Sequence, residues 1–263
     1  MKKLFAGLLA ALMILSLTTL SLAAGRLDKI KADGKLVVGT SPDYAPYEFP
    51  GPDGNPVGAD MDFAKYIADA LGVELVIESY SFEAVLAAVT AGKVDIGIAG
   101  MDPTPERKSS MDFTDIYYNE TNQVILIHKD NADSIKTLED FAGKKVAAQN
   151  GTLQQTLVTE QLKDSECVLI TLIPDGIMEL LTKKVDGLAL ASVVADQYVA
   201  NYPDLVICES KFDYTSSGIA AAIPKDEPDL LAALNEIVAK VVEEKLFYQW
   251  MEAAVELNNS MIK

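Results

Sequence analysis

The stretch GKVDIGIAGMDPTPERKSSMDFTDIYY, residues 92–118, carries the strongest structural and chemical signals in this chain. Its apolar run at 96–99 predicts a short strand. The next residues predict a rigid turn, because Pro103 and Pro105 each restrict one backbone torsion. Arg107 follows, and a guanidinium can bond both oxygens of a carboxylate while peptide N–H groups of the turn add donors. The stretch therefore predicts a binding site for a small carboxylate.

Outward from this stretch, apolar strand-like runs alternate with helical patterns, which predicts an α/β fold with largely parallel sheets. We expect strands at 36–39, 73–77, 146–149, 168–173 and 187–191. We expect helices around 63–71, 85–89, 152–162 and 177–184, and a helical stretch at 228–257 with a break near Glu244. The similar runs KVDIGIAG at 93–100 and KVDGLALA at 184–191 suggest two strands that are each entered from a Lys-Val-Asp turn.

Several motifs in the same order resemble one protein family. A strand followed by Gly-Met-x-x-Thr-Pro-Glu-Arg and then by Asp-Phe-Thr-x-x-Tyr-Tyr closely resembles the amino-acid-binding extracytoplasmic solute-binding proteins of bacterial ABC importers. Further matching segments lie at 36–49, 57–64, 91–95, 143–152 and 246–250, so the resemblance covers nearly the whole chain after its first residues. It implies a two-lobed periplasmic-binding-protein fold of type II, in which each lobe is a mainly parallel sheet flanked by helices and a two-strand hinge joins the lobes.

The expected organisation follows from this resemblance and from the polar segments between the two sets of strands. Residues 1–23 are expected to be a signal peptide, residues 24–118 and 220–263 the first lobe, and residues 119–219 the second lobe. The hinge strands are expected near 119–123 and 215–219. Two crossing strands let lobes close on a ligand with few dihedral changes.

The N-terminus predicts export. Lys2 and Lys3 precede an uncharged stretch at 4–25, and Ser21 and Ala23 suit cleavage before Ala24. The same stretch is long enough to span a bilayer, so a retained anchor is the alternative. No cysteine lies near the cleavage site, which argues against lipidation. We expect an extracytoplasmic location, in the periplasm or at the outer face of the cell membrane.

The amino-acid composition limits the classes of molecule and ion that this protein is expected to bind. Without Lys2 and Lys3, the 22 basic residues fall to 20 against 39 acidic ones, a net charge of −19 that repels nucleic acid and anionic lipid surfaces.

Cys167 and Cys208 could form a disulfide after export, but buried free thiols are an equal alternative. We expect the single histidine, His128, at the surface. The chain shows no cluster of metal ligands at suitable spacing, so we expect neither a metal nor a cofactor.

The family resemblance also implies roles for individual residues of the binding site. Arg107 matches the arginine that holds the ligand's α-carboxylate, and a surface ion pair with Glu106 or Asp112 is the alternative. Thr104 and Thr152 match positions whose backbone N–H groups assist it. Tyr44 and Phe82 match the aromatic residues that enclose the rest of the ligand, although such residues are often plain core. The complete expected ligand-binding set is Tyr44, Phe82, Gly100, Met101, Asp102, Thr104, Arg107, Gln149, Gly151, Thr152 and Ala191.

Two positions depart from the family pattern. Ala191 replaces the acid that usually pairs with the ligand's ammonium, and Asp102 stands where Thr or Ser is usual. We hypothesise that Asp102 has taken over the ammonium. If Asp102 is only a turn-former, a carboxylate ligand without an α-amino group becomes plausible. Ser41 stands where binders of cationic amino acids often carry Asp, which weakens a lysine or arginine assignment. Further polar candidates near the cleft are Glu48, Gln149, Gln154 and Ser192.

The leading functional hypothesis is a non-enzymatic, monomeric importer subunit that captures a polar amino acid and docks on an ABC transporter permease. An enzyme similar to cyclohexadienyl dehydratases is the second possibility, and it would need a general acid such as Asp102 or Glu120. The sensor domain of a membrane receptor is the third. It would require a membrane segment and a signalling domain beyond Lys263, so we expect at most a partnership with a separate receptor.

Overall fold

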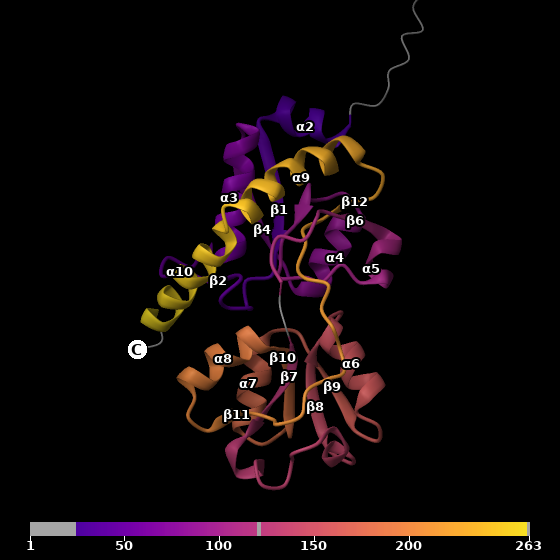
Figure 1. The fold of residues 1–263 in the computed structure, drawn as a ribbon, viewed down its shortest axis with the longest axis vertical. Helices are drawn as coiled ribbons and strands as arrows, with labels where there is room; N and C mark the ends of the chain where they lie inside the picture. The colour runs from indigo at the N-terminus through magenta and orange to yellow at the C-terminus, as the bar shows by residue number, and fades with distance from the viewer. Residues whose placement is uncertain (1–24, 120–121, 262–263) are drawn as a thin grey trace, which may run out of the picture.

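Two α/β lobes lie one above the other along the long axis of the molecule (Figure 1). The computed structural model describes residues 25–119 and 122–261. Within these residues each lobe is built on one five-stranded sheet. The predicted signal peptide and Glu120 lie outside the described residues. In the described part of the chain, no helix combines the length and the apolar character that crossing a membrane would require.

The first lobe has the strand order β4-β1-β5-β12-β6, with β4, β1 and β5 parallel and β12 antiparallel to both of its neighbours. Its strands are β1 Lys35–Thr40, β4 Glu74–Ser79, β5 Ile96–Gly97, β6 Met111–Phe113 and β12 Ala222–Pro224, with a small hairpin of β2 Phe49–Pro50 and β3 Pro56–Val57. Its helices are α2 Arg26–Asp33, α3 Ala59–Leu71, α4 Phe82–Thr90, α5 Pro105–Ser110, α9 Pro228–Glu243 and α10 Leu246–Met261.

The second lobe repeats this plan with the order β11-β7-β10-β8-β9, in which β10, β8 and β9 are parallel and β7 is antiparallel to β10 and β11. Its strands are β7 Gln123–His128, β8 Lys145–Gln149, β9 Glu166–Ile170, β10 Gly187–Ala191 and β11 Leu205–Ile207. Its helices are α6 Leu153–Gln161, α7 Ile173–Leu181 and α8 Ser192–Asn201, with 3₁₀ turns η1 Lys129–Asn131 and η2 Leu138–Phe141.

The two Lys-Val-Asp turns play equivalent roles in the two sheets. The N–H of Asp95 donates to the carbonyl of Val37 (2.8 Å), and the N–H of Val37 donates back to the Asp95 carboxylate (2.9 Å). Asp186 exchanges the same two bonds with Lys145, at 2.7 and 2.9 Å. Each aspartate thus aligns the start of one strand with its parallel neighbour. The carboxyl ends of both sheets then face the space between the lobes, where ligands of open α/β sheets bind.

The C-terminal helices pack on the first lobe. Phe247 of α10 lies among Phe63, Tyr117 and Trp250, with ring centroids 4.7 to 6.2 Å away. The predicted break near Glu244 is present, because Glu244 ends α9 and Lys245 adopts a positive φ of 54°. Polar contacts also join α10 to α8 of the second lobe, where the amide of Asn258 donates to Gln197 (3.3 Å).

Several expectations need correction. Residues 215–218 form no strand; beside them, Ile219 makes only an isolated antiparallel bridge with Tyr118. The strand expected at 168–173 ends at Ile170, because Ile173 and Pro174 already open α7, and proline suits the first turn of a helix. His128 was expected at the surface but is buried at the end of β7, and its Nδ1 accepts from the N–H of Asp130 (3.2 Å). Between the two alternatives left open for the cysteines, the structure has free thiols, with Cys208 buried and Cys167 half-buried.

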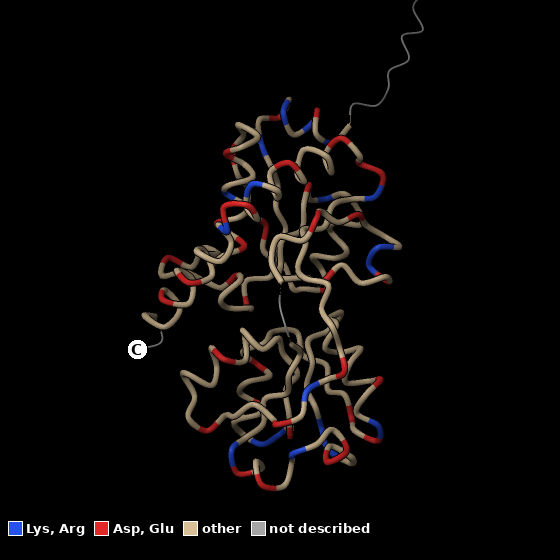
Figure 2. Tube along the Cα trace, in the orientation of Figure 1, with Lys and Arg blue, Asp and Glu red and all other residues tan. Residues whose placement is uncertain are grey.

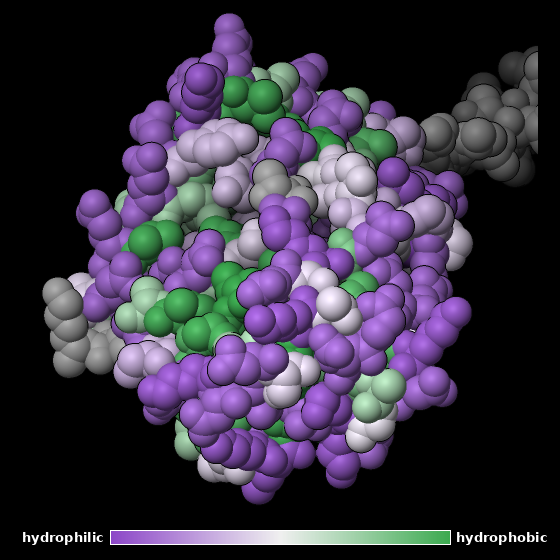
Figure 3. Space-filling view, turned by 60° about the horizontal axis from the view of Figure 1, so that its bottom comes forward, coloured by the Kyte–Doolittle hydropathy of each residue, from purple (hydrophilic) through white to green (hydrophobic). Residues whose placement is uncertain are grey.

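The surface agrees with the acidic composition. Acidic residues are spread over both lobes and outnumber basic ones (Figure 2). The face in Figure 3 is mainly hydrophilic, with a smaller area of apolar side chains. Large exposed apolar side chains include Leu169, Leu172 and Met178, all from β9 and α7 or the link between them.

Candidate functional site

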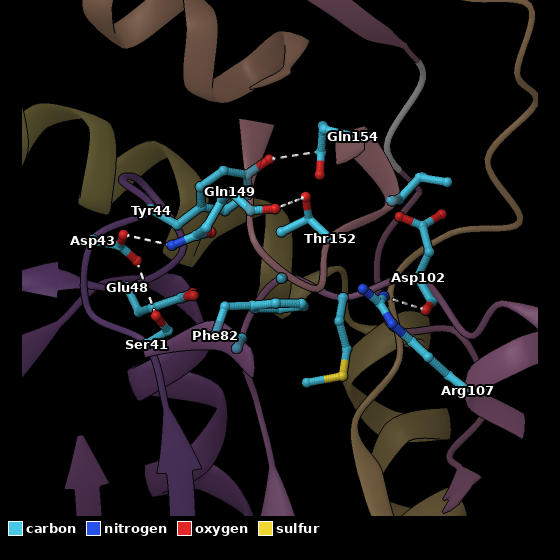
Figure 4. A pocket seen from close by; sticks show the side chains of 14 residues that line it. Ser41, Asp43, Tyr44, Glu48, Phe82, Asp102, Arg107, Gln149, Thr152 and Gln154 are labelled. Carbon is cyan, nitrogen blue, oxygen red and sulfur yellow. Dashed lines mark hydrogen bonds between the residues drawn. The ribbon is translucent and has the colours of Figure 1, made fainter. Parts of the chain in front are cut away.

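A pocket lies between the two lobes, with about 390 Å³ of space outside protein atoms when the open solvent at its mouth is included (Figure 4). The first lobe contributes the loop after β1, the start of α4 and the turn after β5, and the second lobe contributes the link from β8 into α6. The lining residues are Ser41, Asp43, Tyr44, Glu48, Phe82, Ala99, Gly100, Met101, Asp102, Arg107, Gln149, Thr152, Leu153 and Gln154.

Arg107 is held at one end of this pocket by the short helix that follows the proline-rich turn. Thr104 caps α5 by accepting from the N–H of Arg107 (3.3 Å). The Arg107 side chain is buried, with its guanidinium carbon 5.1 Å from the centre of the Phe82 ring. It donates to the carbonyl of Asp102 (2.9 Å) and, across the cleft, to the carbonyl of Gly151 (3.2 Å). Burial lowers its pKa, and the Asp102 carboxylate opposes that shift.

The alternative ion pairs of Arg107 do not form. Asp112 instead pairs with Lys225 at 2.8 Å. Within residues 25–119 and 122–261, no ion pair joins Arg107 to Glu106 or Asp112. Among the described residues, the guanidinium donates to the neutral carbonyl oxygens of Asp102 and Gly151, which an incoming carboxylate could replace with charge-assisted bonds.

Asp102 lies beside Arg107 and contacts the segment that returns from the second lobe. Its Oδ1 accepts from the hydroxyls of Tyr214 (3.1 Å) and Ser216 (2.7 Å). Burial raises the pKa of Asp102, while these two hydrogen bonds and the charge of Arg107 oppose the shift. Both hydroxyls thus bond Oδ1, and the Asp102 side chain lies on the pocket wall.

Tyr44 bridges the lobes at the middle of the pocket. Its ring stacks on Tyr47 with centroids 5.9 Å apart. Its hydroxyl accepts from the N–H of Ala191 (3.1 Å) and from the amide of Gln154 (3.2 Å). Together with Phe82, it supplies the aromatic part of the wall.

Asp43 is a wall residue that the sequence reasoning missed. Its Oδ2 accepts from the amide of Gln149 (2.8 Å) and from the N–H of Ile173 at the start of α7 (2.9 Å), and its Oδ1 accepts from the hydroxyl of Ser41 (3.0 Å). Burial raises the pKa of Asp43, and these hydrogen bonds oppose the rise. Its position directly after the carboxyl end of β1 was the available signal.

Glu48 and Asp60 form a buried pair of acids under the same wall. They are 1% and 0% exposed. Asp60 accepts from the N–H of Gly100 (2.7 Å) and from the hydroxyl of Tyr117 (2.9 Å), and it shares a hydrogen bond with Glu48. Burial raises the pKa of Asp60 to about 6. Burial and the neighbouring charge of Asp60 raise the pKa of Glu48 well above its ordinary value.

The pocket gathers most of the expected residues but not all. Thr104, Gly151 and Ala191 are absent from its lining, although each contributes a backbone hydrogen bond around it. The N–H groups of Thr104 and Thr152 are used inside their own turns, donating to Asp102 (3.0 Å) and Gln149 (3.3 Å). Ser192 is also absent from the lining. Asp43, Ala99 and Leu153 line the pocket without having been singled out.

A further hydrogen bond joins the two lobes beside the pocket. The amide of Asn150 donates to the carboxylate of Glu83, and Gln154 also donates to Gln123 within the second lobe (2.7 Å). No group of three or more His, Cys, Asp or Glu side chains in the described part of the chain is arranged to hold a metal ion.

Comparison with known proteins gives the family. The model for bacterial extracellular solute-binding proteins, family 3, matches residues 36–253. The "Arginine-binding extracellular protein ArtP" of Bacillus subtilis is 33% identical over 95% of this chain and 98% of its own length. A crystal structure of an amino acid ABC transporter substrate-binding protein from Streptococcus pneumoniae bound to L-arginine is 36% identical, with a TM-score of 0.84, covering 88% of this chain and 98% of that one.

A third match bears on the enzyme alternative. An ancestral amino-acid-binding protein described as a precursor of cyclohexadienyl dehydratase is 33% identical, with a TM-score of 0.78, over 86% of this chain and 99% of that one. The two matches above are named as binding proteins. From the family model, this similarity and the two-lobed fold, it follows that the chain belongs to the bacterial extracellular solute-binding proteins of family 3.

Proposed function

We propose that this protein is the extracytoplasmic substrate-binding subunit of an ABC importer and that it captures a basic amino acid by closing its two lobes. The observation that carries the proposal is the buried guanidinium of Arg107 on the wall of an interlobe pocket, whose hydrogen bonds to the described residues end on carbonyl oxygens. The closed, occupied form would dock on the permease. We place the second lobe at 119–219, with the connections near 119–123 and 215–219 acting as the hinge.

Arg107 and Asp102 would receive the two charged groups that all amino acids share. The ligand carboxylate would take over the guanidinium donors, because a charged acceptor forms stronger bonds than a carbonyl. The ammonium would meet the second oxygen of Asp102, since Ala191 offers no acid on the opposite lobe. The presence of a carboxylate beside Arg107 favours an α-amino acid over a carboxylate that lacks the amino group.

The opposite end of the pocket is acidic, which favours a basic side chain. Asp43 and Glu48 lie on the far side of Phe82 from Arg107 and Asp102 (Figure 4). Among the matched proteins, one is named for arginine and another was crystallised with L-arginine. Ser41 lacks the acid that many binders of cationic amino acids carry at this position, but Asp43 and Glu48 place two carboxyl groups within the same wall.

A thermal-shift screen of refolded, ligand-stripped protein tests the proposal. The standard amino acids are added one at a time, because a ligand that binds only the native state raises the unfolding temperature by mass action. We expect arginine or lysine to give the largest shift, and we expect Arg107→Ala to abolish it. Lys108→Ala removes an exposed cation from the same helix and should behave like wild type. A shift that survives Arg107→Ala unchanged would overturn the proposed site.

Two observations support the dehydratase alternative. Asp102 is a buried acid with a raised pKa on the pocket wall, as a general acid requires, and one structural match is described as a precursor of such an enzyme. Incubation with prephenate and arogenate decides between the two functions. We expect no turnover, and turnover that is lost in Asp102→Asn would replace the transport proposal.

A further inference from the structure

The buried acids Glu48 and Asp60 are the feature of the pocket that amino-acid capture alone does not explain. Glu48 comes from the loop before β2, and Asp60 lies in the first turn of α3. Three groups surround the Asp60 carboxylate: the N–H of Gly100, the hydroxyl of Tyr117 and Glu48 itself. Glu48 shares a hydrogen bond with Asp60, its buried Oε2 accepts no hydrogen bond from an N–H or O–H group of the described residues, and its side chain lines the pocket. A buried acceptor left open in this way marks a place for a ligand's donor.

The surroundings of the pair contain further negative charge and no paired cation. A third acid, Asp43 on the loop after β1, adds negative charge near Glu48. The other titratable neighbour is Tyr117, whose phenol donates a hydrogen bond to Asp60. Arg107 lies at the other end of the pocket and bonds the carbonyls of Asp102 and Gly151. In the part of the chain that the structure describes, no Lys, Arg or His forms an ion pair with Glu48 or Asp60.

Two carboxyl groups buried this closely, without a cation, cannot both ionise at neutral pH, so the pair retains a proton between them. The raised pKa values of both groups agree with this conclusion. Because Asp60 already accepts from the N–H of Gly100 and from Tyr117, it is the better-stabilised carboxylate, and Glu48 is the member that carries the proton. A second negative charge on the pair would need a positive partner at the pocket wall.

We propose that a basic ligand side chain binds beside the carboxyl group of Glu48 and drives the shared proton of the Glu48–Asp60 pair into solvent, so that capture of a cationic amino acid is coupled to proton release. The pair changes from one negative charge to two, the ligand brings one positive charge, and the proton passes to a buffer base. A neutral side chain of the same shape leaves the proton in place. This inference rests on the proposed function, because it concerns the same pocket.

Asp43 is the other acid at this end of the pocket, but both of its carboxylate oxygens already accept hydrogen bonds from protein groups. Its two oxygens accept three hydrogen bonds, from Ser41, Gln149 and the N–H of Ile173. The bonds from Gln149 and Ile173 join the two lobes, so a ligand that took them over would weaken closure. Among the described residues, the Glu48 side chain makes no hydrogen bond between the lobes, so its carboxyl group can receive a ligand at no such cost. Glu48 is therefore the residue that distinguishes a cationic from a neutral side chain.

The coupling predicts a pH dependence with a definite sign. Binding that releases a proton becomes stronger as the pH rises, because the solution takes up the proton more readily. Affinity for L-arginine should rise with pH over the range in which Glu48 keeps its proton in the empty pocket, and burial extends that range well above the ordinary pKa of a glutamic acid. Affinity for L-citrulline, which is the neutral isostere of arginine, should rise much less over the same range.

Isothermal titration calorimetry in two buffers with different ionisation enthalpies, such as phosphate and Tris, counts the protons directly. L-arginine and L-citrulline are titrated into ligand-stripped protein near neutral pH. Protons linked to the α-amino and carboxylate ends cancel in the comparison. We expect about one more proton to be released per bound arginine than per bound citrulline. Equal proton release with the two ligands would overturn the inference.

Glu48→Gln adds a second readout, since its amide can still donate to Asp60 but holds no proton to release. In this variant, arginine should bind at least about tenfold more weakly than to wild type, and the proton difference should vanish. Asp62→Asn removes an exposed carboxylate from the same helix as Asp60 and should leave both results unchanged. If Glu48→Gln does not fold, the proton count of the wild-type protein decides alone.

This experiment separates failure of the inference from failure of the proposed function. If arginine and citrulline both fail to bind while another amino acid binds through Arg107, the proton-release inference is overturned and amino-acid capture stands. If no amino acid binds in an Arg107-dependent manner, the proposed function fails and the inference fails with it.

Discussion

At the scale of single residues, buried acids shape both the site and the stability of the empty protein. Asp60 has an ordinary pKa of 3.8 that burial raises to about 6. An acid whose pKa is raised on folding holds its proton more tightly in the native state than in the unfolded state. Asp60 therefore stabilises the protein most below about pH 4, where it is protonated in both the native and the unfolded state. The free energy of unfolding then falls as the pH rises from about 4 to 6, and above that range it is lower by about 3 kcal/mol.

This reasoning predicts that Glu48→Gln stabilises the ligand-free protein at neutral pH. The amide removes one buried titratable group and still bonds Asp60, so the free energy of unfolding of the variant should fall less than that of wild type as the pH rises from about 4 to 8. Urea unfolding of both proteins across that range measures the difference. Parallel profiles would show that the two acids do not share a proton.

Much of the site's residue chemistry could be predicted from the sequence. The Gly-Met-Asp-Pro-Thr-Pro turn and Arg107 carry local signals, namely prolines, a helix cap and a cation at a strand end, and they lie at the pocket. Asp43 and the role of Asp60 could not be predicted in this way. Their importance comes from partners distant in sequence, such as Ile173 for Asp43 and Tyr117 for Asp60.

At the scale of elements, the loop after β1 links the first lobe to the N-terminus of α7. Asp43 accepts from the N–H of Ile173, and a helix N-terminus favours negative charge. We predict that Asp43→Ala weakens ligand binding about tenfold or more by destabilising the closed form. Calorimetry measures the affinity, and Asp53→Ala, in the exposed turn between β2 and β3, is the matched control. Unchanged affinity in Asp43→Ala would mean that this contact does not assist closure.

The start of α3 depends on Gly58, which positions Asp60 two residues later. Gly58 has a φ of 122°, and a Cβ there would lie 2.3 Å from the carbonyl oxygen of Tyr47. We predict that Gly58→Ala destabilises the protein by about 2 kcal/mol or more, because the clash and the backbone strain add. Gly54→Ala is the control, since it has a positive φ of 83° but open space around its Cβ. Equal losses in urea unfolding would show that the close approach to Tyr47 carries no cost.

Element prediction succeeded where hydrophobic periodicity and glycine signals agree. Gly72 ends α3 in the left-handed conformation, and 187–191 is a strand as expected. It failed where tertiary contacts override local pattern. The polar run at 215–218 was expected to be a strand, but Ser216 bonds Asp102 and the N–H of Gly218 instead of a neighbouring strand. His128 was expected at the surface because its neighbours are charged, and packing at the end of β7 buries it.

At the scale of the whole molecule, the two sheets follow one plan and place their ligand-facing ends against each other. In each sheet the strand that follows a crossing between lobes, β12 or β7, runs antiparallel to its neighbours. The contacts of Arg107 with Gly151, Asp43 with Gln149 and Glu83 with Asn150 then span the cleft. Such a molecule can change shape by rotating one lobe against the other while each core stays intact.

The net charge of −17 should also influence capture of a basic ligand. An acidic surface attracts cations over a distance that shortens as salt is added. We predict that the association rate of L-arginine falls as ionic strength rises and that the rate for L-citrulline changes little, which stopped-flow fluorescence of Trp250 and the tyrosines would follow. Identical salt dependence for both ligands would show that the surface charge plays no part in capture.

The central claim is that Arg107 holds the carboxylate of an amino acid, and a thermodynamic cycle measured by calorimetry tests it most directly. Wild type and Arg107→Ala are each titrated with the amino acid that gives the largest thermal shift and with its decarboxylated amine, which is agmatine if that amino acid is arginine. We predict that removing the carboxylate weakens binding to wild type by about thirtyfold or more but changes binding to Arg107→Ala only slightly. An equal loss in both proteins would show that the carboxylate binds elsewhere.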